Sequence, residues 1–222
     1  METLYRMVYF GQPKWMWRGK PAGMARKIER EEALDRALTL FWDHGYRGTS
    51  MEMLTTTLGV EKPSVYASFG SKQQLYLEAL DQYRQLVIDT VQASLNDAPS
   101  ARAGLDRTVR RMMARGGRSE RKGCFATNSA LERADNDPEV QAIIRETFAQ
   151  LTTVFRKAVQ RGQAEGSVRG DRSAELLAHY LVNGIEGARI LERTKASNRV
   201  MGEAAVLTLS ILDPPAAARP QP

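Results

Sequence analysis

The sequence predicts an all-α protein in which an N-terminal three-helix domain with a helix-turn-helix is joined to a longer C-terminal helical domain. Apolar residues recur at helical spacing from Glu29 onward, which is typical of amphipathic helices packed on a core. No segment shows sustained alternation with a period of two residues, so no β-sheet is expected. Glycines and prolines fall between the periodic segments, where helices end and turns form.

The first periodic segment begins near Glu29 and carries one apolar stripe. Its members follow the spacing i, i+3, i+4, i+7 and are Leu34, Ala37, Leu38 and Phe41. Gly45 comes after the stripe. It is expected to end this helix, because glycine adopts the left-handed conformation of helix C-termini at little cost.

A capping box is expected to open the second helix. The Thr49 side chain would accept a hydrogen bond from the amide of Glu52, while the Glu52 carboxylate reaches back to the Thr49 amide. Gly59 interrupts this helix after a short run, and Pro63 suits the first turn of the next helix. This helix–turn–helix spacing, at about residues 50–69, is the scaffold that sets a second helix into the major groove of DNA.

Six further helices are expected after this motif. Ser71 is expected to cap a long helix that begins at Lys72 and whose apolar stripe includes Tyr76 and Tyr83. The other five are expected at about residues 101–115, 124–134, 138–161, 172–193 and 199–212. Their number and length predict a helical C-terminal domain.

Composition excludes several classes of protein. The chain has 222 residues, of which 42% are hydrophobic, and no apolar run approaches the roughly 18 residues that a membrane span needs. Its only cysteine, Cys124, rules out an internal disulfide and fits a reducing cytoplasm. No metal-ligand spacing, phosphate-binding glycine loop or catalytic constellation occurs, so no metal ion, cofactor or enzymatic activity is expected.

The net charge of +6 admits a polyanionic partner but does not locate its binding surface. Residues 1–30 carry seven Lys and Arg against two acids, whereas residues 31–72, which contain the helix-turn-helix, carry four against six. Individual residues must therefore identify a DNA-binding surface.

The run TSMEMLTTTLGVEKPSVYASFGSKQQLY resembles the N-terminal signature of the TetR/AcrR regulators, with a Thr-capped second helix, a Gly-Val turn and a third helix that ends in Phe-x-x-Lys. The resemblance covers about residues 27–87, which are expected to form the DNA-binding domain. It implies a ligand-responsive repressor that binds a palindromic operator as a cytoplasmic homodimer and is released by a small-molecule effector. It also implies that residues 88–213 form the effector-binding and dimerisation domain.

The resemblance implies contacts to the DNA backbone from three places in the helix-turn-helix and at the start of the next helix. Thr49 or Ser50, at the start of the second helix, would donate to a phosphate with the help of the helix dipole. Tyr66 and Lys72 match a tyrosine and a lysine that hold backbone phosphates in the family.

Base reading is implied for the start of the third helix. Lys62 and Ser64 are the best candidates for reaching base edges. Pro63 stands where a glycine is common, and Ala67 and Ser68 stand where bulky residues are common. Specificity is therefore expected to depend on Lys62, Ser64 and DNA shape.

Two other interpretations stay open. Tyr66, Phe69 and Lys72, each taken singly, also fit structural roles in a helical hairpin. The chain could also be a ligand-binding or enzymatic helical dimer whose helix-turn-helix no longer reads DNA, which the acidity of residues 31–72 favours.

An effector pocket is expected within the helices of residues 75–193. Its candidate lining residues are Met112, Phe125, Asn128, Phe148, Leu151, Phe155, Tyr180 and Asn183. Core packing explains most of them equally well. The small residues Gly184 and Gly187 let another helix approach closely, either within the chain or across the dimer that the family forms through its late C-terminal helices.

Cys124 has two interpretations. It is expected at a helix start, where amides and the dipole favour a thiolate, and the segment KGCFATNSALE resembles one in TetR regulators that respond to electrophiles and oxidants. Cys124 would then be a redox or electrophile sensor. The alternative is a small buried hydrophobic residue packed beside Phe125.

The two ends of the chain show no apolar periodicity. Residues 1–26 are predicted to form a disordered arm, and residues 214–222 a disordered tail. The stretch MARKIEREEALDRAL begins at Met24 in the way these regulators usually begin. We therefore expect residues 1–23 to be dispensable, with Met24 as a candidate start.

Overall fold

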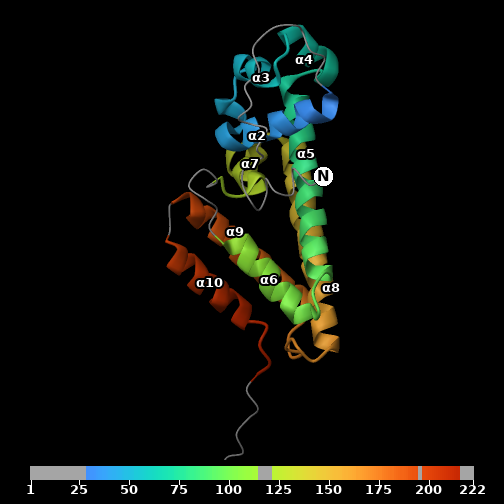
Figure 1. Ribbon diagram of the computed structural model, residues 1–222, viewed down its shortest axis with the longest axis vertical. Helices are drawn as coiled ribbons and strands as arrows, with labels where there is room; N and C mark the ends of the chain where they lie inside the picture. The colour runs from blue at the N-terminus through green and yellow to red at the C-terminus, as the bar shows by residue number, and fades with distance from the viewer. Residues whose placement is uncertain (1–28, 115–121, 195–196, 216–222) are drawn as a thin grey trace, which may run out of the picture. The chain divides into compact units, whose positions relative to one another are not determined.

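The computed structural model describes residues 29–114, 122–194 and 197–215, and all regular elements among these residues are helices (Figure 1). They are α2 (Arg30–Gly48), α3 (Met51–Leu58), α4 (Lys62–Phe69), α5 (Lys72–Asn96), α6 (Ala101–Met113), α7 (Phe125–Arg133), the 3-10 helix η2 (Ala134–Asn136), α8 (Pro138–Ala164), α9 (Ala174–Arg193) and α10 (Asn198–Ser210). The all-α prediction is confirmed. None of these helices is both long and apolar enough to cross a membrane.

Some predictions lie outside the described residues. These are the disordered arm of residues 1–26, the dispensability of residues 1–23 with a start at Met24, and most of the tail, from residue 216 onward.

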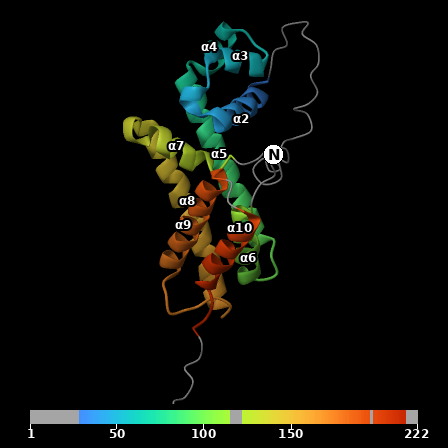
Figure 2. The same cartoon turned by 90° about the vertical axis from the view of Figure 1, so that its left-hand side faces the viewer.

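The chain folds into two compact units. The first contains the described residues up to Val87 together with those of segment 116–147, and the second contains the remainder. Helices α5 and α8 each contribute their N-terminal part to the first unit and their C-terminal part to the second. Figure 2 shows α2, α3 and α4 gathered around the start of α5. Helix α7 also belongs to the first unit, where it packs against α2.

Aromatic side chains form the centre of the first unit's core. Phe41 and Trp42 of α2, Tyr76 and Tyr83 of α5, and Phe125 of α7 are all at most 6% exposed. The rings of Trp42 and Tyr83 meet edge to face with centroids 5.0 Å apart, and so do those of Phe41 and Tyr76. Such pairs add about 0.5–1.5 kcal/mol beyond the burial of their area. Three members of the stripe predicted for the first helix, Ala37, Leu38 and Phe41, are therefore buried, whereas Leu34 is only partly buried.

The entry into the helix-turn-helix differs from the prediction in two details. Gly45 breaks α2 where the end of the first helix was predicted, but its φ of 72° and ψ of 176° lie outside the left-handed helical region, and one more helical turn follows it. The prediction of a capping box of Thr49 and Glu52 is wrong, because Ser50 is the N-cap of α3 and its Oγ atom accepts a hydrogen bond from the Met53 amide at 3.1 Å. The Thr49 hydroxyl instead donates to the Gly45 carbonyl at 2.7 Å, so it closes the preceding turn.

The other predicted helix boundaries in this region are confirmed. Gly59 ends α3 in the left-handed conformation, with φ 70° and ψ 32°. Pro63 lies in the first turn of α4, where a missing amide hydrogen costs no hydrogen bond. Ser71 Oγ accepts from the Gln74 amide at 3.0 Å at the start of α5.

Helices α6, α9 and α10 pack on one another in the second unit. Helix α10 approaches Gly184 of α9 closely, since a Cβ atom on this glycine would lie 2.8 Å from the Cγ2 atom of Thr208. Among the described residues, no atom outside the local helix backbone lies within 4 Å of the corresponding position on Gly187. Close packing within the chain therefore explains the small residue at 184 but not the one at 187.

Candidate DNA-binding site

Apolar side chains fix the two helices of the helix-turn-helix. Leu54 and Leu58 of α3 and Val65 and Phe69 of α4 are at most 5% exposed. Helix α3 contacts both α2 and α4. Because the inward faces of both helices are packed, their outward faces are held in a defined geometry.

The outward face of α4 is polar or small. Lys62, Pro63, Ser64 and Ala67 are exposed, and Tyr66 is 42% exposed. The Lys62 Nζ atom lies 5.9 Å from the centroid of the Tyr66 ring. No carboxylate occurs between Lys62 and the end of α4. This face therefore offers hydrogen-bond donors to base edges and phosphates without an acid on the same helix that would repel DNA.

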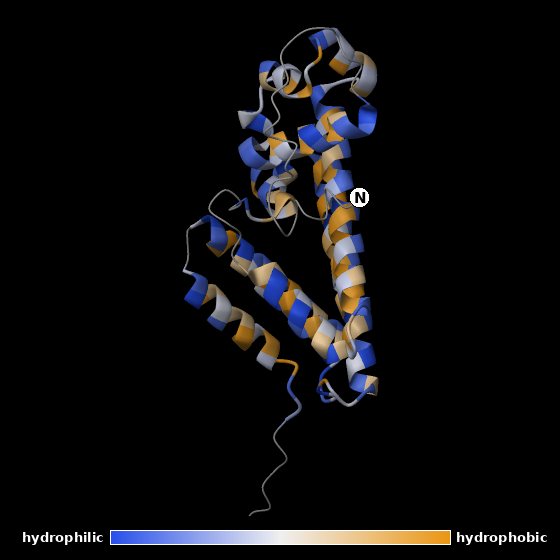
Figure 3. Cartoon of the chain, in the orientation of Figure 1, coloured by the Kyte–Doolittle hydropathy of each residue, from blue (hydrophilic) through white to orange (hydrophobic). Residues whose placement is uncertain are grey.

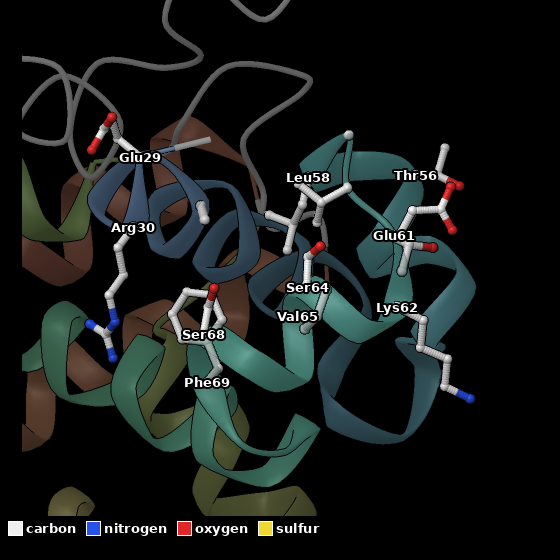
Figure 4. A pocket seen from close by; sticks show the side chains of 14 residues that line it. Glu29, Arg30, Thr56, Leu58, Glu61, Lys62, Ser64, Val65, Ser68 and Phe69 are labelled. Atoms are coloured by element: carbon white, nitrogen blue, oxygen red, sulfur yellow. The ribbon is translucent and has the colours of Figure 1, made fainter. Parts of the chain in front are cut away.

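A groove runs beside α4, lined also by the start of α2 and the end of α3 (Figure 4). Its lining holds the carboxylates of Glu29 and Glu61 beside the cations of Arg30 and Lys62, so it carries no excess of positive charge that would favour a phosphate. Figure 4 shows the Lys62 side chain extending away from α4 rather than across the groove. The other cation of the lining, Arg30, is paired with Glu78 at 2.6 Å.

Of the two hydroxyls at the start of α3, only that of Ser50 is exposed. Thr49 is 0% exposed, and its hydroxyl donates to the carbonyl of Gly45. Its proton is therefore not directed toward a phosphate, and the predicted pair of donors is reduced to Ser50.

Lys72, at the start of α5, lies against an aromatic ring. Its Nζ atom is 4.2 Å from the centroid of the Tyr46 ring. Burial lowers the pKa of Lys72, Glu132 opposes this effect, and Arg133 adds to the lowering. The Arg133 guanidinium carbon lies 3.8 Å from the centroid of the same Tyr46 ring. Lys72, Tyr46 and Arg133 therefore form a cluster that joins the start of α5, the end of α2 and the end of α7.

Glu132, which reaches the helix-turn-helix from α7, was not among the predicted site residues. Its two carboxylate oxygens accept hydrogen bonds from the amides of Tyr46 and Arg47, at 2.9 and 2.7 Å. The break at Gly45 was the only signal in the sequence, since a break leaves amides without helical partners. This break did not indicate that the acceptor for the Tyr46 amide would be Glu132, 86 residues further along the chain.

The eight residues predicted for the effector pocket have different surroundings. Four lie in the second unit and are buried or partly buried: Met112, Phe148, Leu151 and Phe155. Phe125 belongs to the aromatic core of the first unit, and Asn128 of that unit donates to a backbone carbonyl at 2.8 Å. Tyr180 and Asn183 are exposed on α9. The structure therefore places these last two on an outward face rather than an inward one.

Cys124 is the N-cap residue of α7 and is 7% exposed. Its Sγ atom accepts a hydrogen bond from the Tyr83 hydroxyl at 3.4 Å. The positive charge two residues before the thiol, that of Lys122, is paired with Asp43 at 2.5 Å. These surroundings fit the packed alternative, and the sensor role stays a prediction.

Two family models match the chain. The model described as bacterial regulatory proteins, tetR family, matches residues 33–79, which include the helix-turn-helix. The model described as tetracyclin repressor-like, C-terminal domain, matches residues 102–207. The two matches together account for both units of the fold.

The chain is also similar to bacterial regulators along most of its length. It is 26% identical over 197 residues to the uncharacterized HTH-type transcriptional regulator YezE of Bacillus subtilis, which covers 86% of this chain and 100% of YezE. It is 26% identical over 196 residues to the HTH-type transcriptional repressor ComR of Escherichia coli, covering 86% and 92% of the two chains.

Solved structures agree with these relatives. A cysteine mutant of the TetR family transcriptional regulator CifR, complexed with 26-bp double-strand operator DNA, aligns with a TM-score of 0.75 and 27% identity. The alignment covers 86% of this chain and 100% of that one. A TetR transcriptional regulator from Chloroflexus aurantiacus aligns with a TM-score of 0.72 and 26% identity, over 82% and 92%. The helix-turn-helix, the helical second unit and these matches together show that the chain belongs to the TetR family of bacterial transcriptional regulators.

Proposed function

We propose that this protein is a ligand-responsive transcriptional repressor that binds a palindromic operator as a homodimer. The observation that carries the proposal is the outward face of α4, which presents Lys62 and Ser64 on a packed helix-turn-helix. The relatives support it, because ComR is described as a repressor and the CifR structure contains operator DNA.

Each exposed residue of the helix-turn-helix described above has a proposed role in DNA binding, and so does Lys72. Lys62 and Ser64 contact base edges in the major groove, since both are exposed in the first turn of α4. Ser50, Tyr66 and Lys72 contact backbone phosphates and set the register of the protein on the duplex. The exposed Pro63 and Ala67 add contact area but no donor, so DNA shape contributes to specificity.

The second copy packs on α9 and α10. The large exposed apolar residues of these helices are Leu176, Tyr180, Ile190, Leu191, Val200, Val206 and Leu207. On α9, Leu176, Tyr180 and Leu191 share one helical face with Gly187, whose Cβ position is open. Figure 3 shows hydrophobic residues toward the C-terminal end of α10. Exposed apolar residues that share a helical face in this way mark an interaction site.

Effector binding releases the operator through a shift in a conformational equilibrium. An effector can act in this way only if it binds the form that does not bind DNA more tightly. We place its site in the second unit, with Met112, Phe148, Leu151 and Phe155 as candidate lining residues. The protein acts without catalysis, in the cytoplasm where the chromosome lies.

Selection from random duplexes by mobility shift tests the proposal. We expect an inverted repeat to be enriched, because a two-fold symmetric dimer presents two identical α4 helices. Failure of a folded dimer to enrich any duplex would favour the other interpretation, a helical ligand-binding dimer whose helix-turn-helix no longer reads DNA.

A further inference from the structure

The last turn of α2 is separated from the rest of that helix. Gly45 has φ 72° and ψ 176°, so the helical hydrogen-bond ladder is interrupted at this residue. The amides of Tyr46 and Arg47 follow the break and need acceptors outside α2. An unsatisfied amide at such a position costs about 1–3 kcal/mol when it is buried.

Glu132 supplies both acceptors from another helix. Its Oε2 atom accepts from the Tyr46 amide at 2.9 Å, and its Oε1 atom accepts from the Arg47 amide at 2.7 Å. A carboxylate that accepts two amides at the start of a helical turn is a strong cap, since the bonds are charge-assisted. The fit is close, because a Cβ atom on Gly45 would lie 2.7 Å from Oε2.

The capped turn leads directly to α3. The Thr49 hydroxyl donates to the Gly45 carbonyl at 2.7 Å, and Ser50 is the N-cap of α3. The Tyr46 ring of the same turn lies beside the cations of Lys72 and Arg133. The Glu132 carboxylate of α7 is thus hydrogen-bonded to the turn that precedes α3, and one of its two donors belongs to Tyr46, whose ring contacts Lys72.

We propose that Glu132 is a positioning residue for operator binding. By capping the turn after Gly45, it sets the orientation of α3 and of Lys72 relative to α7. The segment that carries it lies within the match to the C-terminal family model, so this contact ties that part of the sequence to the helix-turn-helix. The inference rests on the proposed operator binding.

The test compares Glu132→Gln with Asp135→Asn in the full-length protein. Asp135 is exposed in η2, three residues further on, and each change removes one negative charge, so a purely electrostatic effect on DNA affinity is the same in both. We expect Glu132→Gln to bind the selected operator at least about fivefold more weakly than Asp135→Asn in a fluorescence anisotropy titration. Glu132→Asp, which keeps the charge but shortens the side chain, should show an intermediate loss.

Hydrogen exchange at single amides provides a readout that does not depend on DNA. We expect faster exchange at Tyr46 and Arg47 in Glu132→Gln, with the amide of Tyr76 in the α5 core unchanged. Unchanged exchange at the two amides would overturn the cap. Equal operator affinity of Glu132→Gln and Asp135→Asn, or a loss no larger than the fraction unfolded by circular dichroism, would overturn the positioning role. If the wild type selects no operator, the proposed function fails, and the exchange data still decide the cap.

Discussion

Helix α4 and the α9–α10 pair bury similar residues but present different chemistry to solvent. Their inward positions are apolar, as Val65 in α4 and Leu181 in α9 illustrate. Outward, α4 presents Lys62 among small and polar residues, whereas the other pair presents side chains such as Leu176 and Leu207. The inward faces thus build the fold, while the outward faces carry the partners that we propose: DNA for α4 and a second copy of the chain for α9–α10.

The largest effect is expected from a charge placed on the apolar outward face. Leu207 is 69% exposed on α10, and Leu207→Glu would bury an unpaired carboxylate between two copies. We expect self-association, measured by sedimentation equilibrium, to weaken at least about 100-fold, or about 2.7 kcal/mol.

A leucine in the other unit provides the control. Leu131 on α7 is 77% exposed and lies outside the α9–α10 face. Leu131→Glu should leave self-association unchanged. Equal weakening by both substitutions, or by neither, would contradict the assignment of the dimer surface.

The next effect concerns the turn that precedes the reading face. In Gly45→Ala, the alanine would have to adopt φ 72° and ψ 176°, and its Cβ atom would lie 2.7 Å from the Glu132 carboxylate. We therefore expect a loss of about 2–3 kcal/mol in the free energy of unfolding. Gly59 has nearly the same φ, 70°, but its ψ of 32° places it in the left-handed helical region, and no atom of the described residues outside its own helix lies within 4 Å of its Cβ position. Gly59→Ala should therefore cost only about 1–2 kcal/mol in a urea titration. Equal losses would show that neither the extended ψ of Gly45 nor its contact with Glu132 adds to the cost of a side chain there.

Lys62→Ala tests whether the polar face reads bases. We expect a loss of about 1–3 kcal/mol that is largest at one operator position, whereas Tyr66→Phe should weaken binding to all sequences alike. Lys157→Ala, which removes an exposed lysine of α8 in the second unit, controls for net charge. A uniform loss for Lys62→Ala across sequences would reassign Lys62 to a phosphate.

The smallest effect is expected at Cys124. Because the residue is 7% exposed and packed beside Tyr83, we expect hypochlorite to change operator binding equally in the wild type and in Cys124→Ser. A loss of operator binding confined to the wild type would establish the sensor role instead.

Local patterns predicted most of the helical architecture. The apolar stripe after Glu29, the glycine at 59 and the cap at Ser71 depend on residues close in sequence, and all three appear in the structure. The capping box failed because Thr49 and Ser50 are both good caps. Only the fold of the preceding turn, where Thr49 bonds to Gly45, decides between them.

The contacts of the candidate site that join distant segments could not be predicted. Glu132 is one acid among the 26 acidic residues of the chain, and nothing in its neighbourhood marks it as the acceptor for Tyr46. Similarly, Gly184 and Gly187 look alike in sequence, but only the position of α10 shows that the first is covered within the chain. Both distinctions depend on tertiary packing rather than on periodicity.

The most direct test of the account is the affinity of the wild type for the full operator and for a duplex in which one half-site is scrambled. Once one α4 helix of the dimer is bound to its half-site, binding of the other α4 helix is intramolecular and raises the total affinity. We therefore expect scrambling of one half-site to weaken binding at least about 100-fold. Two protomers should bind each full operator in sedimentation measurements. Equal affinity for the two duplexes, or one protomer on the full operator, would contradict the assignment of α4 to DNA and of α9–α10 to the second copy.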